Sequence, residues 1–197
     1  MTGAPITTTL GLLRHGQTDW NIEFRLQGIT DVPLNATGLE QARTAAARIL
    51  AADWDALMSS PLSRALDTAR IVHEVSGIAV DDVIVDEILL ERSFGEAEGE
   101  LYAEWKAKHT GDPAGAESRA ALSLRVQAFL DSVARDYRGQ RVLAVSHGAF
   151  IREMLDLVSN GTLPPEGERI GNACLNVFEC DAAGAWSVSR YAPQPLA

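Results

Sequence analysis

Two short apolar runs, far apart along the chain, each lead into a histidine and a glycine. The first run, at residues 8–13, ends in Arg14-His15-Gly16, and the second, at residues 142–145, ends in Ser146-His147-Gly148. A nearly continuous apolar run is typical of a strand that is covered on both faces of a sheet. We therefore predict two buried strands, each of which delivers a histidine to its carboxyl end.

Elsewhere, apolar residues recur with the spacing of amphipathic helices. Thr37-Gly38-Leu39-Glu40 has the form of a capping box and predicts a helix that ends near Ala52. Ser59-Ser60-Pro61 predicts the start of a second helix, with Arg64 in its first turn, off the apolar stripe. Further helices are expected at residues 101–108, 117–137 and 149–158, and further strands at residues 55–58, 175–179 and 186–191. Residues 83–90 are expected to form a strand or an extended entry into the segment of Glu91, and loops are expected at residues 16–35 and 110–116.

The alternation of strands and helices predicts an α/β fold, a three-layer sandwich whose mainly parallel central sheet has helices on both faces. A chain of 197 residues fits one domain, residues 1–197, and buries a core without disulfides or a structural metal. In such sheets ligands bind beyond the carboxyl ends of the strands. This topology gathers His15, Arg64 and His147 at one rim.

The charge of the chain limits the classes of partner. A formal net charge of −10 argues against nucleic acid, because a polyanionic backbone requires a basic face. Eight acidic residues and only one arginine lie between Asp81 and Glu100, and we interpret them as a solvated acidic surface, apart from Glu91. The chain lacks the roughly 18 consecutive apolar residues of a membrane span, and its first residues lack the pattern of a secretory signal. We therefore expect a cytoplasmic protein.

Two arginines and two histidines beside a helix start suit an anion, because guanidinium groups and helix-terminal N–H groups match phosphate oxygens. Taken singly, Arg64 is typical of an exposed helix residue and His147 of a core histidine. A zinc site is disfavoured, because no His-x-His or cysteine pair completes a ligand set and Arg14 would place a positive charge beside the metal. Cys174 and Cys180 are expected to pack as small apolar groups.

Four blocks of residues carry a resemblance to a known family. They are Arg14-His15-Gly16-Gln17-Thr18 with Asn21 and Gln27-Gly28, Ser59-Ser60-Pro61 with Arg64-Ala65 and Thr68-Ala69, Glu91 with Phe94-Gly95 and Glu98-Gly99, and Ser146-His147-Gly148. In this order they resemble the motifs of the histidine phosphatase superfamily, in its cofactor-dependent phosphoglycerate mutase-like branch. The resemblance runs from Leu10 to Ala149 and implies the phosphoglycerate mutase-like fold.

The resemblance implies a role for each matched residue. His15 would attack phosphorus and form a phosphohistidine, and adjacent arginines would disfavour its imidazolium form. Glu91 would protonate the leaving alkoxide and then accept a proton from water. Arg14, Arg64 and His147 would hold the phosphoryl oxygens, and Asn21, Gln27, Gly28 and Gly148 would bind phosphate or substrate. No metal or other cofactor is expected, because the cationic side chains take its place.

The family contains phosphatases and mutases, and the sequence favours a phosphatase that acts on a phosphate monoester. Mutases carry more basic residues after the acid motif and a longer insertion before the next helix. Here only 25 residues separate Glu91 from Glu117, and Tyr102 stands eleven residues after Glu91, where mutases typically have a lysine. A 2,3-bisphosphoglycerate-dependent phosphoglycerate mutase is the alternative.

A second alternative is a non-catalytic member that binds a phosphorylated metabolite or a partner protein. The complete set of nucleophile and proton donor argues against it, because a pure binder needs neither. The expected ligand is a small phosphorylated metabolite or inorganic phosphate. Its identity depends on the loops at residues 19–33 and 93–116 and stays open. The oligomeric state also stays open, and a homodimer is common among members of the family.

Overall fold

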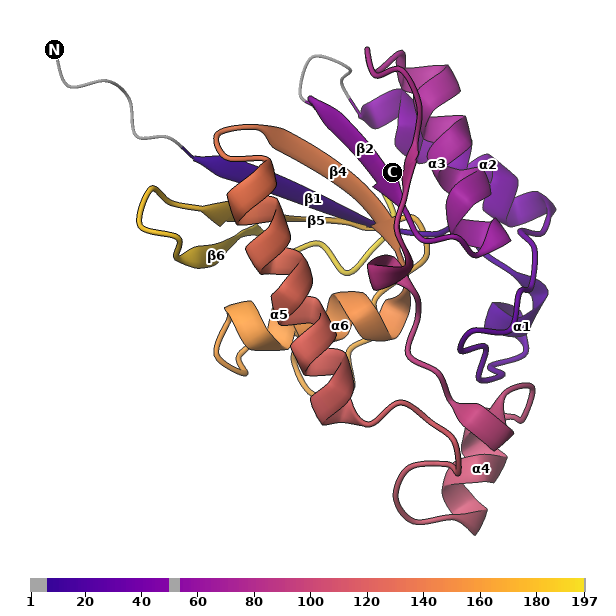
Figure 1. The fold of residues 1–197 in the computed structure, drawn as a ribbon. Helices are drawn as coiled ribbons and strands as arrows, with labels where there is room; N and C mark the ends of the chain where they lie inside the picture. The colour runs from indigo at the N-terminus through magenta and orange to yellow at the C-terminus, as the bar shows by residue number, and fades with distance from the viewer. Residues whose placement is uncertain (1–6, 50–53, 197) are drawn as a thin grey trace, which may run out of the picture.

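The computed structural model describes residues 7–49 and 54–196, which share one six-stranded sheet. The strands lie in the order β3-β2-β4-β1-β5-β6. The central strand β1 (Thr8–Arg14) runs parallel to β4 (Arg141–Ser146) and antiparallel to β5 (Leu175–Cys180). The remaining strands are β2 (Ala56–Ser59), β3 (Ile84–Val85) and β6 (Trp186–Arg190). The predicted α/β fold with a mainly parallel sheet is confirmed (Figure 1).

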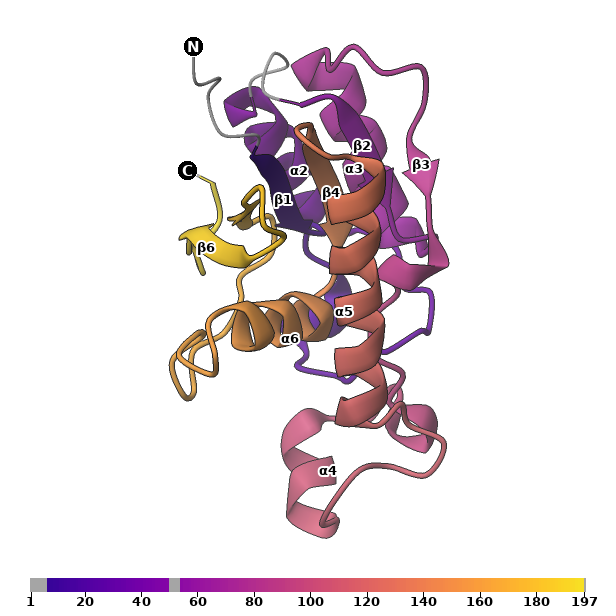
Figure 2. The ribbon, with the colours of Figure 1, turned by 60° about the vertical axis from the view of Figure 1, so that its left-hand side comes forward.

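Helices cover both faces of this sheet, as Figures 1 and 2 show. One face carries α2 (Ala36–Arg48) and α3 (Ser63–Ser76), and the other carries α5 (Arg119–Asp136) and α6 (Gly148–Val158). Side chains of β1 alternate between the two layers: Leu10 and Leu12 pack with α5 and α6, and Leu13 packs with α2 and α3. This alternation explains why the strand is apolar along its whole length.

Shorter helices lie in the connections. They are α1 (Asp19–Ile22), α4 (Tyr102–Lys108) and the 3₁₀ turns η2 (Glu87–Leu89) and η3 (Gly95–Ala97). Both views place α4 away from the sheet, on the side toward which the carboxyl ends of β1 and β4 point (Figures 1 and 2). None of the helices in residues 7–49 and 54–196 is long and apolar enough to cross a membrane.

Helix starts differ from their prediction. Asn35, not a capping box at Thr37, caps α2 by accepting the N–H of Gly38 at 2.9 Å. Helix α3 begins only at Ser63, after Pro61, and the carboxylate of Asp31 accepts the N–H of Ser63 at 2.8 Å. The predicted end of the first helix near Ala52 lies outside the described residues.

Two connections also differ from prediction. The segment at residues 16–35 contains the short helix α1, whose cap Thr18 accepts the N–H of Asn21. The segment at residues 83–90 forms only the two-residue strand β3 before turning into η2. Cys174 and Cys180 are buried and unpaired, as predicted for small apolar groups.

Candidate active site

His15 follows directly after β1 and is only 2% exposed. Its Nδ1 lies 2.6 Å from the carbonyl oxygen of Gly16, which can only accept a hydrogen bond. The proton of the neutral ring is therefore on Nδ1, and Nε2 keeps a lone pair. The backbone N–H of His15 donates to the carbonyl of Ser146 at 3.0 Å, which fixes the residue to the next strand.

The parallel register brings the second histidine beside the first. Arg14 pairs with Ser146, the last residue of each strand, so His15 and His147, which follow them, lie together with ring centroids 5.1 Å apart. His147 is fully buried, and its Nε2 lies 2.8 Å from the hydroxyl of Ser60, at the end of β2. The predicted convergence of segments that follow three strands is therefore present in the structure.

Arg14 and Arg64 place two guanidinium groups in the same region. Arg64 lies in the first turn of α3, as predicted, but it is 1% exposed and shares the buried face with Ala65 instead of lying on the surface. It donates to the carbonyls of Gly28 and Thr30, both at 2.8 Å. These carbonyls belong to the loop before α2, so Arg64 connects that loop to α3.

Three buried nitrogens of this cluster have no hydrogen-bond partner among the described residues: Arg14 Nε, Arg64 Nε and His147 Nδ1. Buried polar groups are normally paired, and an unpaired one costs about 1–3 kcal/mol. Gly148 lies beside the first of them, since a Cβ there would be 3.4 Å from Arg14 Nε. An anion with several acceptor oxygens, such as phosphate, would satisfy these groups.

Burial controls the protonation of the cluster. Burial and then the charges of Arg64 and Arg14 lower the pKa of His15 well below its usual value. The pKa of His147 is also lowered well below its usual value. Burial is the largest cause, and the charge of Arg64 is the next. Burial lowers the pKa of Arg64 to about 10, so it stays charged at neutral pH. The cluster thus combines neutral imidazoles with cationic guanidinium groups.

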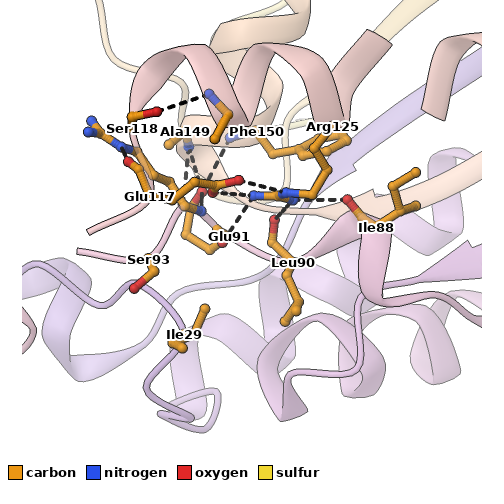
Figure 3. Close-up of polar contacts among 12 residues, drawn as sticks. Ile29, Ile88, Leu90, Glu91, Ser93, Glu117, Ser118, Arg125, Ala149 and Phe150 are labelled. Carbon is orange, nitrogen blue, oxygen red and sulfur yellow. Dashed lines mark hydrogen bonds and ion pairs between the residues drawn. The ribbon is translucent and has the colours of Figure 1, made fainter. Parts of the chain in front are cut away.

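Glu91 lies across from the cluster, at the N-terminus of α6. Its carboxylate accepts the backbone N–H of Ala149 at 3.1 Å and that of Phe150 at 3.2 Å (Figure 3). Its negative charge acts on both Arg64 and Arg14, raising the pKa of each against the larger effect of burial. The carboxyl group is therefore close enough to the guanidinium groups to interact with them.

The other predicted ligand residues lie around the same loops. Gln27 is 8% exposed, and its Oε1 is buried without a hydrogen-bond partner in the described structure. Gly28 has φ +54°, a conformation that favours glycine. Asn21 points its Oδ1 inward, where it accepts from Thr18 N–H at 3.0 Å and from Asn172 at 3.1 Å.

The sequence patterns did not predict Asn172 as a residue of the site. Its amide nitrogen donates to the carbonyls of His15 and Gly16 at 3.1 and 3.3 Å, and so fixes the turn after β1. It lies in an irregular segment before β5, and no local pattern marks it.

Glu98 corrects the interpretation of the acidic segment as a solvated surface. Its carboxylate accepts the N–H groups of Ile29, Thr30 and Phe94 at 2.9–3.1 Å, and also the hydroxyl of Thr30. Burial raises the pKa of Glu98, but these hydrogen bonds outweigh it and lower the pKa overall. Glu98 therefore holds the loop of Gln27 and Gly28 in place. The sequence signal for this role was that Glu98 belongs to one of the four blocks that resemble the family, the block that begins at Glu91.

No group of three or more histidine, cysteine or acidic side chains in the described ranges is arranged to hold a metal ion. The chemistry that the arrangement allows is transfer of a phosphoryl group to a neutral imidazole. The electrostatic stabilisation comes from arginines and backbone N–H groups.

Comparisons with known proteins agree with this geometry. Residues 10–193 match the sequence model of the histidine phosphatase superfamily, branch 1. The chain is 37% identical to the uncharacterized phosphatase PhoE of Bacillus subtilis, covering 93% of this chain and 94% of that protein. It is 32% identical to 2,3-bisphosphoglycerate-dependent phosphoglycerate mutase 2 of Gloeobacter violaceus, covering 90% and 88%. Among solved structures, it resembles a mycobacterial glucosyl-3-phosphoglycerate phosphatase in complex with VO3, with a TM-score of 0.77, 30% identity and coverage of 93% and 98%.

Proposed function

The chain belongs to the histidine phosphatase superfamily, and from this we propose that it hydrolyses a small phosphate monoester through a phosphohistidine on His15. We also propose that residues 1–197 act as one domain. The observation that carries the proposal is the contact of His15 Nδ1 with the carbonyl of Gly16, which leaves Nε2 as the nitrogen with the lone pair. Two buried guanidinium groups, whose Nε atoms have no partner among the described residues, belong to the same cluster. This arrangement suits attack on a phosphate monoester.

In the first step, His15 Nε2 attacks phosphorus and the ester P–O bond breaks. Glu91, protonated in the productive complex, gives its proton to the leaving alkoxide, so that an alcohol departs. Arg14, Arg64 and His147 hold the phosphoryl oxygens, where negative charge must be stabilised as the group transfers. His15 then carries the phosphoryl group on Nε2, and Glu91 is a carboxylate.

In the second step, water attacks the phosphohistidine. Glu91 accepts a proton from the water, the P–N bond breaks, and inorganic phosphate forms. His15 returns to its neutral form with the proton on Nδ1, and Glu91 is again protonated. In this proposal Gln27 and the backbone of Gly28 contact phosphate or substrate, and the side chain of Asn21 borders the same turn.

Several features support a phosphatase over a mutase. The B. subtilis relative named as a phosphatase is more similar to this chain than the G. violaceus mutase, at 37% against 32% identity. Glu96 and Glu100 are exposed in the segment that follows Glu91, and Tyr102 is 48% exposed at the start of α4. The charged side chains of residues 96–100 are all carboxylates, and the nearest cations recorded there are Arg25, bound to the carbonyl of Gly99, and Lys106, over the ring of Tyr102.

The similarity to the mutase keeps phosphoglycerate mutase as a second candidate, since it extends over 90% of this chain. The phosphatase and mutase functions are distinguished by incubating the protein with 3-phosphoglycerate and 2,3-bisphosphoglycerate, and in parallel with a panel of phosphate monoesters. We expect phosphate release to exceed isomer formation. Predominant formation of 2-phosphoglycerate would overturn the choice.

Substitution of His15 tests the nucleophile. We expect His15→Ala to lower phosphate release by at least about a thousandfold, because the covalent step has no substitute. His73→Ala is the matched control, since His73 lies in α3 and contacts the carbonyl of Val80. The measurement is phosphate release from the best ester, together with mass detection of a phosphorylated His15 in the parent. Equal activity in His15→Ala and the parent would refute the mechanism. Failure to detect phosphorylated His15 in the parent would also refute it and would favour a binding protein.

A further inference from the structure

The segment that carries Glu91 is weakly tied to the sheet. Strand β3 pairs with β2 only at Ile84 and Val85, and the chain then leaves the sheet. The backbone carbonyls of residues 88–91 each accept a hydrogen bond from a side chain of another element. One of them, that of Leu89, accepts from the hydroxyl of Ser146 at 2.8 Å. The position of Glu91 therefore depends on side chains rather than on a ladder of strand hydrogen bonds.

Arg125, on α5, provides the other three of these bonds. Its Nη1 donates to the carbonyls of Ile88 at 2.9 Å and Leu90 at 2.7 Å, and its Nη2 donates to the carbonyl of Glu91 at 3.4 Å (Figure 3). The guanidinium group of Arg125 thus binds the main chain of Glu91, the proposed proton donor, and that of residues just before it.

The guanidinium group is itself held in one orientation. Glu117 accepts from its Nε at 2.9 Å and its Nη2 at 2.6 Å, a two-point contact that matches the planar fork of arginine. The ring of Phe150 lies 5.5 Å from the guanidinium carbon. The backbone N–H of Phe150 also donates to the carboxylate of Glu91. Arg125 and the N-terminus of α6 therefore hold Glu91 from two sides.

We propose that Arg125 is a positioning residue that holds the main chain of Glu91, and so places its carboxyl group to protonate the leaving oxygen. The inference rests on the proposed function, in which Glu91 is the proton donor. Arg125 does not touch the substrate in this proposal. A lysine at this position keeps the charge but cannot bind three carbonyls and a carboxylate in one plane.

The role predicts a dependence on the leaving group. Expulsion of p-nitrophenolate needs little help from a proton, whereas the more basic phenolate gains more from one. Both esters are similar in size, so a general loss of folding or binding affects them alike. The quantity to measure is kcat/KM for p-nitrophenyl phosphate and phenyl phosphate, because kcat/KM covers the steps up to departure of the alcohol.

We expect Arg125→Ala and Arg125→Lys to lower kcat/KM for phenyl phosphate by about tenfold more than for p-nitrophenyl phosphate, since displacement of a catalytic group has effects of this order. Glu91→Gln should show the same preference with a larger loss, about a hundredfold. Combining Arg125→Lys with Glu91→Gln should add little to the loss of Glu91→Gln alone, because both changes remove the same proton transfer.

Arg135→Ala is the matched control, because Arg135 lies on the same helix and pairs with Asp136 at the surface. This control variant should leave the ratio of kcat/KM for phenyl phosphate to kcat/KM for p-nitrophenyl phosphate unchanged. Thermal unfolding of each variant checks folding, and Arg125→Lys keeps the test available if Arg125→Ala does not fold. Equal losses on both substrates, or additive losses in the double variant, would overturn the role of Arg125. If Glu91→Gln shows no preference, the donor assignment itself fails and the inference fails with it.

Discussion

Ser60 contacts His147, one of the residues proposed to hold the phosphoryl oxygens. The Ser60 hydroxyl accepts a long hydrogen bond from Leu62 N–H at 3.4 Å and lies 2.8 Å from His147 Nε2. If its own proton points to Nε2, the neutral ring carries its hydrogen on Nδ1, the nitrogen without a partner in the described structure. Nδ1–H is then a donor for a phosphoryl oxygen.

Ser60→Ala should therefore weaken catalysis without unfolding the protein. We expect kcat to fall by about tenfold, because His147 loses the group that fixes its tautomer, and Ser60→Thr should restore it. Ser59→Ala is the control: Ser59 is also fully buried, and its hydroxyl donates to the carbonyl of Ser60. Steady-state kinetics on one ester measure the effect. Equal losses in the two alanine variants would contradict a specific role for Ser60.

At the scale of elements, helix α2 packs very closely against the turn after β1. A Cβ on Gly38 would lie 2.1 Å from the carbonyl oxygen of Gln17, and a Cβ on Gly16 would lie 2.3 Å from that of Gly38. Both obstacles are backbone atoms, which cannot move aside like the end of a flexible side chain. The first turn of α2 and the turn that carries His15 therefore fit only if both positions are glycine.

Gly38→Ala should destabilise the protein although alanine favours helices. The gain in helix propensity is at most about 1 kcal/mol, and overpacking costs about 1–3 kcal/mol. We expect a net loss in the free energy of unfolding, measured by urea denaturation, and a lower kcat because the turn of His15 shifts. Thr37→Ala, at the exposed neighbouring position, should leave both nearly unchanged. A Gly38→Ala variant as stable as the parent would contradict the close contact.

The sequence predicted the elements whose signal is local. The runs that end in Arg14 and Ser146 are apolar because both faces of β1 and β4 are covered, so their ends were visible in the pattern. The start of α3 was not visible, because Asp31 accepts the N–H of Ser63 from a distant loop. The segment before Glu91 was predicted as a strand or an extended entry. Only Ile84 and Val85 form a strand, and side chains of Arg125 and Ser146 bind the carbonyls that follow. Such contacts between distant side chains leave no periodic pattern.

At the scale of the whole molecule, the buried histidines couple folding to pH. The pKa values of His15 and His147 are well below 6.5 in the folded protein, and in the unfolded chain they return to about 6.5. Below pH 6.5 the unfolded chain therefore binds protons that the folded protein does not. Stability is fully present above this pH and decreases as the pH falls toward the folded-state pKa values.

We expect the free energy of unfolding of the ligand-free protein to decrease as the pH falls from 7.5 to 5.5, with a contribution from each histidine. Urea denaturation across this range measures it. The His15→Ala variant should lose part of the dependence, because one buried imidazole remains. A parent protein whose stability is constant from pH 7.5 to 5.5 would contradict neutral burial of the two rings.

The proposed nucleophile and the proposed proton donor are held by different parts of the molecule. His15 follows the central strand, which is hydrogen-bonded on both sides. The residues around Glu91 are held outside the sheet, by the side chains of Arg125 and Ser146 and by the N-terminus of α6. On warming, the segment around Glu91 should therefore lose its position before the turn that carries His15 does, while the secondary structure is still intact. In that interval the protein would still cleave esters of acidic phenols but would turn over alkyl esters poorly, so its substrate range would narrow before it melts.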